Sequence, residues 1–410
     1  MFLQNVDSGS FVPYRSNRMK ILVIGGGMAG LTYAIVAAKN GQDVTVVERN
    51  TRVGKKISMT GNGKCNIGNA RVTPACFNKS SVANKVLAEI SVDEYIKFLQ
   101  SVGIYVFEDS EGRMYPFCES ASNVVDCLRN QVEKYGGKII CDAEVFNVRP
   151  VDKGYEVLID RTNYRFDKVV AACGSKSQAN ETNVFSVIPK EYFTPLSPSL
   201  VPVKTKTIDH VLNGLRAKAD VSLMDGAVPI AKESGEVLFK DYGLSGICIF
   251  NLSAVIARRI VQGKQGNYKF VLDLLPKFSQ WDLEEILYFR LKSGEQPQRL
   301  FYGLLHNKIA ESIVKSCDNR SDVSKLSYAA KNLSFDFARL LDYSMSQVTA
   351  GGIDERYIDL KTLALPNGIT ALGEMLNVDG VCGGNNLYFA AASALYTFTP
   401  EQRSKAYKLI

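Results

Sequence analysis

Apolar and polar positions along the first 50 residues predict a strand, a helix and a second strand. Residues 20–24 (KILVI) form a short apolar run, typical of a buried parallel strand. Residues 28–40 (MAGLTYAIVAAKN) repeat apolar side chains at helical spacing, at positions 31, 34, 35 and 38, and Gly41 follows as a helix stop. Residues 43–48 (DVTVVE) predict the next strand.

The same segment has two other possible interpretations, because a basic stretch precedes eighteen uncharged residues, 21–38. A membrane span needs about twenty residues without repeated helix breakers, and a signal peptide needs a small-residue cleavage site. Gly25, Gly26 and Gly27 interrupt the run at its centre, so we favour two separate elements. Residues 1–18 are expected to be a disordered leader, with Met19 as a candidate natural start.

Three glycines between the predicted strand and helix indicate a dinucleotide site. Gly25, Gly27 and Gly30 follow the G-x-G-x-x-G pattern, in which the first glycine permits the turn, the second admits a pyrophosphate and the third allows close packing. The phosphates would lie at the helix N-terminus. Glu48, at the end of the second strand, can accept hydrogen bonds from an adenosine ribose. The alternative is a structural turn without a ligand.

The next region continues this pattern. Val124, Val125, Leu128 and Val132 form a helical stripe, and residues 138–148 predict a strand. A hairpin and a buried strand follow and end at Cys173 and Gly174. Such a β-meander is typical of FAD domains of the glutathione-reductase type, in which Val145 would offer its backbone to the adenine and Gly174 would close over the adenosine.

Residues 368–398 predict a short strand, an acidic residue, a Gly-rich turn and a helix that begins near Asn385. Glu374 can hydrogen-bond a ribityl hydroxyl, and the helix N-terminus at 383–386 can stabilise negative charge on a reduced flavin. NAD(P) dehydrogenases do not need this element, so the pattern favours FAD. A Gly-capped final helix is the alternative for this segment alone.

Composition narrows the function classes. A length of 410 residues allows two or three domains, and the net charge of +7 is spread along the chain, which makes nucleic acid an unlikely partner. Nine scattered cysteines predict reduced thiols in a cytoplasmic protein. The sequence has no C-x-x-C and no Cys/His cluster, so we predict neither a metal site nor a paired-cysteine reductase.

Several longer motifs carry a family resemblance, over about Lys20 to Ala394. They are GGGMAGL, GKKISMTGNGKCNIGN, GRMYPFCESASNVVDCL, PSLVPV, GEVLFKDYGLSGI, TAGGI and GEMLNVDGVCGGNN. With them the chain resembles the BaiN-like (aminoacetone oxidase-type) family of bacterial NAD(P)/FAD-dependent oxidoreductases. In relatives the loop corresponding to Gly61 to Asn66 wraps the flavin and pyrophosphate, which implies the same placement here.

The resemblance also implies the fold class: α/β, with a Rossmann-like FAD-binding domain of the glutathione-reductase type and an inserted β-barrel plus helical substrate domain. We expect the FAD-binding domain at 19–199 and 346–410 and the insert at 200–345. A Pro-rich junction (TPLSPSLVPV) and the TAGGI segment agree with these boundaries. Within the insert, LSGICIFNLSAVIARRIVQG and QWDLEEILYFRLKSG have helical periodicity.

The chain departs from the family pattern where a substrate is expected. Lys240 and Asp241 replace Thr-His, Ile247 replaces Pro, and residues 385–388 (NNLY) replace Tyr-Asn-Leu-Gln. Lys64 replaces an Arg and so loses a bidentate donor. The family's FAD frame therefore transfers to this chain, whereas the chemistry of its relatives does not.

The predicted cofactor residues share a place in these motifs. They are Gly25, Gly27, Met28, Ala29, Gly30, Glu48, Arg49, Lys56, Gly61, Asn62, Gly63, Lys64, Cys65, Asn66, Val145, Cys173, Gly174, Gly373, Glu374, Gly380, Gly383, Gly384, Asn385 and Asn386. Catalytic candidates near the flavin ring are Cys65, Tyr242, Asn385 and Tyr388, with Tyr115 as a weaker one. Each has a structural alternative as a buried thiol, a core aromatic or a helix cap. No general acid or base can be named.

These observations predict an FAD-dependent oxidoreductase that transfers a hydride through flavin N5. No second G-x-G-x-x-G unit follows residue 201, so NAD(P)H, as a reductant, would bind transiently over the flavin. We expect reduction of an activated double bond in a small organic substrate. One alternative is an O2-using oxidase of a small amine or hydroxyl compound that makes H2O2, and another is a flavin-dependent RNA-modifying or RNA-binding protein. The oligomeric state is not predicted.

Overall fold

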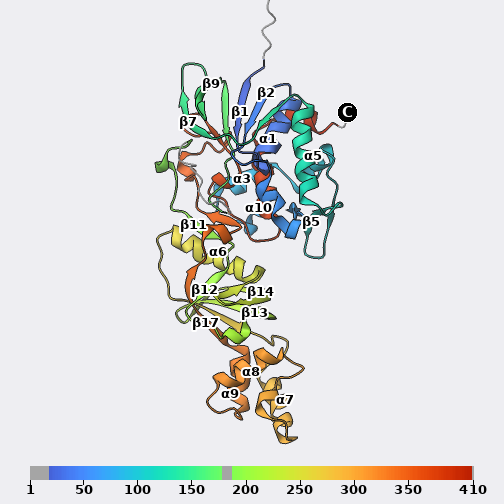
Figure 1. The fold of residues 1–410 in the computed structure, drawn as a ribbon, viewed down its shortest axis with the longest axis vertical. Helices are drawn as coiled ribbons and strands as arrows, with labels where there is room; N and C mark the ends of the chain where they lie inside the picture. Colours follow the sequence, from blue (N-terminus) through green and yellow to red (C-terminus); the bar gives the residue numbers. More distant parts are fainter. Residues whose placement is uncertain (1–17, 178–186, 409–410) are drawn as a thin grey trace, which may run out of the picture.

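The computed structural model describes residues 18–177 and 187–408, so the predicted leader lies outside the described residues except for its last position. Figure 1 shows an elongated molecule with three regions in line: a nucleotide-binding region, a β-barrel, and a group of helices at the far end. No helix of the described ranges combines the length and the apolar character that crossing a bilayer requires.

A parallel five-stranded sheet forms the centre of the nucleotide-binding region. Its strands, in spatial order, are β19 (Thr370–Ala371), β10 (Lys168–Ala171), β1 (Lys20–Ile24), β2 (Asp43–Val47) and β6 (Lys138–Ile140). The short apolar runs predict these buried strands because both faces of the sheet are covered. Helices on one face are α1 (Met28–Lys39), α5 (Ala121–Lys134) and α10 (Asn385–Tyr396), and the antiparallel sheet of β7 (Val145–Pro150), β8 (Tyr155–Ile159) and β9 (Thr162–Phe166) lies across from α5 (Figure 1).

The predicted single strand over 138–148 is wrong, because the chain breaks between β6 and β7. Asp142 adopts a left-handed φ of 54°, and its N–H donates to the carbonyl of Asn50 at 3.1 Å. The N–H of Ala143 donates to the carbonyl of Glu48 at 3.2 Å. These bonds turn the chain past the end of β2 and into the second sheet.

A closed six-stranded barrel forms the middle region. In order around the barrel, its strands are β12 (Val203–Thr205), β15 (Gly243–Ser245), β14 (Val228–Lys240), β13 (Arg216–Asp225), β16 (Tyr268–Asp273) and β17 (Leu333–Leu340). Helix α6 (Ile247–Val261) packs against β14 and faces the nucleotide-binding region. The distal helices are α7 (Gln280–Lys292), α8 (Asn307–Ser316) and α9 (Val323–Lys331).

Separate apolar cores stabilise the two main regions, and a small third cluster joins them. Leu200, Ala254 and Val348 make up that cluster, with Phe250 and Cys382 packed against it. Beside it, the antiparallel pair β11 (Ser197–Ser199) and β18 (Val348–Ala350) carries the chain between the regions. The remaining elements are α2 (Lys55–Ser58), β3 (Gly68–Asn69), α3 (Ser81–Glu89), α4 (Val92–Ser101), β4 (Val106–Glu108), β5 (Arg113–Pro116) and α11 (Pro400–Tyr407).

Candidate flavin and substrate site

A large cavity of about 1160 Å³ connects the nucleotide-binding region with the barrel. Its wall includes the glycine turn after β1 at one side and residues of β14 and the start of α6 at the other. Pockets for drug-sized ligands have volumes of about 300–1,000 Å³. The cavity therefore has room for more than one small molecule, such as a dinucleotide together with a substrate.

The glycine turn has the geometry that a pyrophosphate requires. Gly25 has a φ of 103°, and a Cβ placed there would lie 2.4 Å from the carbonyl oxygen of Ala172. A Cβ at Gly30 would lie 2.0 Å from the carbonyl oxygen of Gly25, so strand and helix pack too closely for any side chain. At Gly27 no atom lies within 4 Å of such a Cβ. The middle glycine thus leaves open space at the N-terminus of α1, which suits a phosphate.

Glu48 lies where a ribose would extend from this turn. Its Oε2 accepts from the N–H of Gly26 at 2.9 Å, and its Oε1 accepts from the N–H of Asn50 at 2.8 Å. The side chain is 9% exposed and lines the cavity. The Asn50 side-chain amide also donates to Oε1. These donors fix the carboxylate, and Oε2 keeps a lone pair with which to accept from a ribose hydroxyl.

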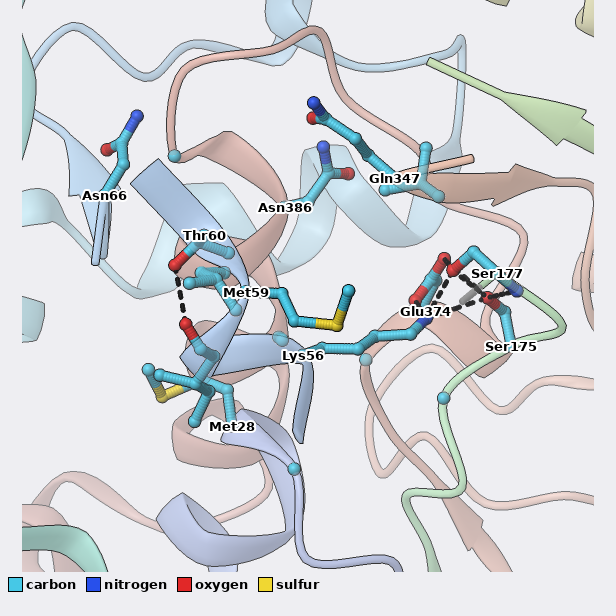
Figure 2. Close-up of a pocket in the computed structure, with 18 of the residues that line it drawn as sticks. Met28, Lys56, Met59, Thr60, Asn66, Ser175, Ser177, Gln347, Glu374 and Asn386 are labelled. Carbon is cyan, nitrogen blue, oxygen red and sulfur yellow. Dashed lines mark hydrogen bonds and ion pairs between the residues drawn. The ribbon is translucent and has the colours of Figure 1, made fainter. Parts of the chain in front are cut away.

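Lys56 and Glu374 form the polar floor of the cavity's middle section. The Lys56 Nζ lies 2.6 Å from Glu374 Oε2, and it also donates to the Ser175 hydroxyl at 3.1 Å. Figure 2 shows the Lys56 side chain reaching across the cavity from α2 toward Glu374, Ser175 and Ser177. Glu374 Oε1 additionally accepts from the N–H of Thr349 at 2.9 Å. The cluster therefore ties the Gly-rich C-terminal segment to the strand that returns from the barrel.

Two asparagines hold the loop 61–69 against the Gly-rich turn before α10. The Asn69 amide donates to the carbonyl of Gly383 at 3.0 Å, and the Asn66 amide accepts from the N–H of Gly384 at 3.2 Å. Gly384 has a φ of 91°, and a Cβ there would lie 2.1 Å from the carbonyl oxygen of Gly68. Segments more than 300 positions apart thus form one wall, and the N-terminus of α10 faces it.

Asn386 fixes the shape of that Gly-rich turn. Its side chain accepts from the N–H of Gly380 at 2.8 Å and donates to the carbonyl of Gly380 at 2.9 Å. Figure 2 shows its amide close to that of Gln347, which comes from the segment leaving the barrel. Both residues line the cavity. The turn and the returning segment therefore meet at the same part of the cavity.

The barrel contributes a wall of side chains. Arg216 of β13 and Glu236 of β14 form an ion pair at 2.7 Å, and both line the cavity. Ile247, 54% exposed, and Phe250 line the cavity from the first turn of α6. Glu233 of β14 lies on the same wall. This arrangement presents one apolar surface, the Arg216–Glu236 ion pair and the carboxyl of Glu233 to a bound substrate.

A buried ion pair joins α6 to the loop before the Gly-rich turn. Arg258 Nε lies 3.2 Å from Asp379 Oδ2, and an Arg258 guanidinium nitrogen donates to the Asp379 carbonyl at 2.9 Å. Asp379 is 1% exposed, and burial raises the pKa of its carboxyl, while the guanidinium opposes that shift. The pair fixes the barrel relative to the nucleotide-binding region.

The structure places the four predicted catalytic side chains off the described cavity wall. Cys65 is fully buried, and burial raises the pKa of its thiol to about 12. Tyr388 is buried and its hydroxyl donates to the carbonyl of Ile90 at 2.5 Å. The Asn385 amide donates to the carbonyl of Val381 at 3.2 Å. Burial raises the pKa of the Tyr242 hydroxyl. Their catalytic roles stay predictions, and the weaker candidate Tyr115 does line the cavity.

Most of the predicted cofactor residues lie together on the wall. These are Gly25, Gly27, Met28, Ala29, Glu48, Arg49, Lys56, Gly61, Asn62, Lys64, Asn66, Val145, Cys173, Gly174, Gly373, Glu374, Gly383, Gly384 and Asn386. The others, Gly30, Gly63, Cys65, Gly380 and Asn385, are not part of it. Gly30 and Gly380 instead shape the turns that carry the wall.

Sequence reasoning missed most of the barrel-side wall and part of the middle section. The residues it did not assign to the site include Met59, Thr60, Ser175, Ser177, Arg216, Glu233, Glu236, Phe250 and Gln347. The motif GEVLFKDYGLSGI pointed to the right segment, because Glu236 and Ile247 belong to it. Glu233 and Arg216 lie outside any motif, and no sequence signal identified them.

Together, the fold and the cavity define an FAD-dependent oxidoreductase. The comparison with known families then gives the particular group. The model named HI0933-like protein Rossmann domain matches residues 19–183, and the model named HI0933-like protein barrel and H2TH domain matches residues 197–344. The chain belongs to this HI0933-like family, which confirms the predicted BaiN-like relationship and fold class.

Curated relatives align over nearly their whole length. The 3-dehydro-bile acid delta(4,6)-reductase of Clostridium scindens is 29% identical over 398 residues, which is 91% of this chain and 97% of that protein. The ribosomal RNA dihydrouridine synthase of Haemophilus influenzae is 29% identical over 402 residues, 91% and 96% of the two chains. The enzyme of that name from Escherichia coli is 25% identical over 403 residues, 92% and 96%.

A solved structure also aligns with most of the chain. It is the open conformation of a flavocytochrome c3 fumarate reductase, with a TM-score of 0.46 and 15% identity, and the alignment covers 95% of this chain and 79% of that one.

Proposed function

We propose that this protein uses FAD and NAD(P)H to reduce a carbon–carbon double bond conjugated to a carbonyl group in a small organic substrate. The names of the curated relatives support this reaction class. One is a delta(4,6)-reductase of a 3-dehydro-bile acid, and the others make dihydrouridine. A 4-ene-3-ketone and the uracil ring share a double bond next to a carbonyl group, so the same addition of hydrogen serves both.

The observation that carries the proposal is the continuity of the cavity. The wall with the glycine turn and Glu48 suits the dinucleotide, and the barrel wall with Ile247 and Phe250 lies in the same cavity. A bound flavin supplies the hydride. The chain's own groups hold the cofactor, orient the substrate and exclude water from the space between them.

Several groups have defined places in this scheme. The N-terminus of α1 and Gly27 would bind the pyrophosphate, and Glu48 would bind the adenosine ribose. Lys56 and Glu374 would lie beside the ribityl chain. The N-terminus of α10 would lie near the pyrimidine end of the flavin, where a positive dipole end stabilises the negative charge of the reduced ring.

Anaerobic stopped-flow spectroscopy tests the proposal. The purified protein is mixed with NADH or with NADPH, and the flavin absorbance is followed. The reduced protein is then mixed with 2-cyclohexenone or a 4-ene-3-ketone steroid, or with aerated buffer. Fast bleaching by a nucleotide and reoxidation that is faster with an enone than with O2 are expected. No bleaching by either nucleotide, with fast reoxidation by O2, would instead indicate an oxidase.

A second candidate has an RNA uracil as the substrate, and the distal helices favour it. Trp281, Tyr288 and Phe289 of α7 and Tyr328 of α9 are 69%, 48%, 62% and 58% exposed. Exposed aromatic rings provide stacking surfaces for bases. In the same stopped-flow assay, reoxidation by a uridine-containing RNA hairpin but not by the enones would favour this candidate. Loss of that reaction in W281A, with nucleotide oxidation intact, would assign the RNA contact to α7.

A further inference from the structure

Glu233 has different surroundings from the three glutamates of the cavity that pair with a cation. It lies on β14, it is partly buried, and it faces the first turns of α6. Five other glutamates line the cavity: Glu48, Glu111, Glu144, Glu236 and Glu374. Glu374 and Glu236 are paired with Lys56 and Arg216, and Glu111 lies 3.1 Å from Arg113. Among the residues that the structure describes, no cation forms an ion pair with Glu233.

An amide holds the Glu233 carboxyl in place. The Asn251 Nδ2 donates to Glu233 Oε2 at 3.3 Å, and Asn251 Oδ1 accepts from the backbone N–H of Cys382 at 3.0 Å. A backbone N–H can only donate, so the second bond fixes which end of the amide faces Glu233. The chain of contacts runs from β14 through α6 to the Gly-rich turn, and it sets the carboxyl relative to the flavin-binding wall.

The groups around Glu233 favour its neutral form. Burial raises the pKa of the carboxyl, and the Asn251 hydrogen bond opposes that shift only in part. The thiols of Cys248 and Cys382, on the elements packed against Glu233, interact with it electrostatically, and burial raises their pKa to about 11 and about 12. Both thiols stay protonated near neutral pH and bring no charge. Lys232, next on the strand, is paired with Asp220 at 2.7 Å, and Arg216 is paired with Glu236.

We propose that Glu233 is the catalytic acid that gives a proton to the substrate's α-carbon. The inference rests on the proposed function. The substrate's carbon–carbon π bond breaks: its β-carbon gains the hydride from the reduced flavin, which is oxidised, and its α-carbon takes the proton as the Glu233 O–H bond breaks. The carboxylate that remains is reprotonated from water. The substrate thereby gains one hydride and one proton, which together are two electrons and two protons.

The charge balance of the barrel wall also bears on the substrate's charge. With Arg216 and Glu236 neutralising each other, the barrel wall has no net positive charge for a phosphate, and Leu238, Ile247 and Phe250 give it an apolar part. A neutral conjugated ketone fits this wall better than a polyanion. A nucleotide substrate would need its phosphates held outside the wall.

The test compares E233Q with the wild type and with E285Q, a matched change at an exposed position of α7. Flavin reduction by NAD(P)H should be unchanged in E285Q, and it is measured separately in E233Q so that the enone reaction is compared in fully reduced protein. Reoxidation by 2-cyclohexenone should slow at least about 100-fold in E233Q alone, the usual effect of losing a general acid. The alkaline decline of this rate in the wild type should also disappear in E233Q.

A second readout needs no turnover. The pKa of Glu233 is raised in the folded protein, so its ionisation opposes folding as pH rises above the unfolded value of about 4.3. The Tm of cofactor-free E233Q relative to the wild type should therefore increase from pH 5 to pH 8, while E285Q shows no such trend. A Tm difference between E233Q and the wild type that does not change with pH would overturn the proposal. Enone reoxidation of E233Q at the wild-type rate would also overturn it. If the wild type itself reacts with neither an enone nor a uridine probe, the proposed function fails first and this assignment with it.

Discussion

The two walls of the cavity differ in the groups that they present to a ligand. The nucleotide-binding wall exposes backbone at its glycine turns, where Gly25 and Gly384 have no room for a side chain and Gly27 leaves open space. The barrel wall consists of side chains from β13, β14 and α6, such as Arg216, Glu233 and Ile247. Backbone contacts do not depend on side-chain identity, so they can bind the same cofactor in many relatives. Side-chain contacts change with single substitutions, so the barrel wall can acquire a different substrate. We expect cofactor choice to be constant and substrate choice to vary.

The largest expected effect comes from the glycines of the first wall. G30A forces a Cβ to within 2.0 Å of the Gly25 carbonyl oxygen, so overpacking should cost about 3 kcal/mol of stability or more. G27A meets no protein atom within 4 Å, so its Tm should match the wild type while its FAD Kd rises about 100-fold, about 2.7 kcal/mol. Thermal unfolding and flavin titration of cofactor-free protein measure both. Unchanged FAD affinity in G27A would contradict the placement of the pyrophosphate.

The ion pair between the walls gives the next effect. R258M leaves Asp379 buried without its cation, which should cost about 3 kcal/mol in the free energy of unfolding at pH 8. Burial already raises the pKa of Asp379, and loss of the guanidinium raises it further. A group whose pKa is raised in the folded protein destabilises it as pH rises and the group ionises. The loss of stability in R258M should therefore be smaller at pH 5 than at pH 8.

A double variant is the control for this prediction. D379N added to R258M removes the buried charge, so the pH dependence of the deficit should vanish and part of the stability should return. Urea unfolding at pH 5 and pH 8 provides the free energies. A deficit in R258M that is the same at both pH values would show that the carboxyl is not the source of the cost.

A smaller effect is expected on the barrel wall. I247A truncates a side chain that is 54% exposed, so Tm and FAD content should stay close to the wild type. The apparent KM for a hydrophobic enone should rise about 10-fold, because the lost methylene contacts are worth roughly 1–3 kcal/mol. Steady-state kinetics with 2-cyclohexenone and a steroid enone measure it. If FAD binding weakens as much as enone binding, the two walls do not act separately.

The smallest effect concerns the reactivity of the cysteine thiols, which reports how accessible each thiol is to solvent. All nine cysteines are free, and Cys118 is exposed. Burial raises the pKa of Cys65 and Cys382 to about 12 and that of Cys248 to about 11, so iodoacetamide at pH 8 should label Cys118 first. Peptide mass spectrometry after short labelling gives the order. Early labelling of Cys382 would indicate that the region between the walls opens in solution.

Local patterns predicted the first wall well. The elements β1, α1 and β2 follow the strand, helix and strand expected for residues 20–48, and the helical stripe at Val124, Val125, Leu128 and Val132 is buried on α5. Helix α10 begins at Asn385 as predicted. Periodicity and glycine turns are local properties, so one sequence is enough to find them.

Side-chain direction in irregular backbone was the main failure of sequence reasoning. Lys64 and Asn66 line the cavity, whereas Cys65 between them has a φ of 62° and points into the core. Similarly, Asn386 lines the cavity and Asn385 does not. A motif names a loop, but only the φ and ψ angles of that loop decide which of two neighbours faces the ligand.

The barrel wall was beyond prediction for another reason. Glu233, Asn251 and Cys382 belong to a strand, a helix and a distant loop, and they meet only because the barrel packs on the nucleotide-binding region. The break in the strand predicted over residues 138–148 was missed because the left-handed turn at Asp142 accompanies hydrogen bonds from Asp142 and Ala143 to the carbonyls of Asn50 and Glu48. Such contacts depend on tertiary packing.

The pairing of β11 with β18 has a consequence for how such enzymes diversify. Ser197 lies opposite Ala350 and Ser199 opposite Val348, so the two ends of the intervening segment are side by side. The intervening residues 200–347 can therefore be replaced as one unit, because both junctions lie next to each other in a single antiparallel strand pair. A chimera of two related proteins joined at these strands would have the substrate range of the protein that supplies the barrel segment. It would keep the redox cofactor of the protein that supplies the nucleotide-binding region.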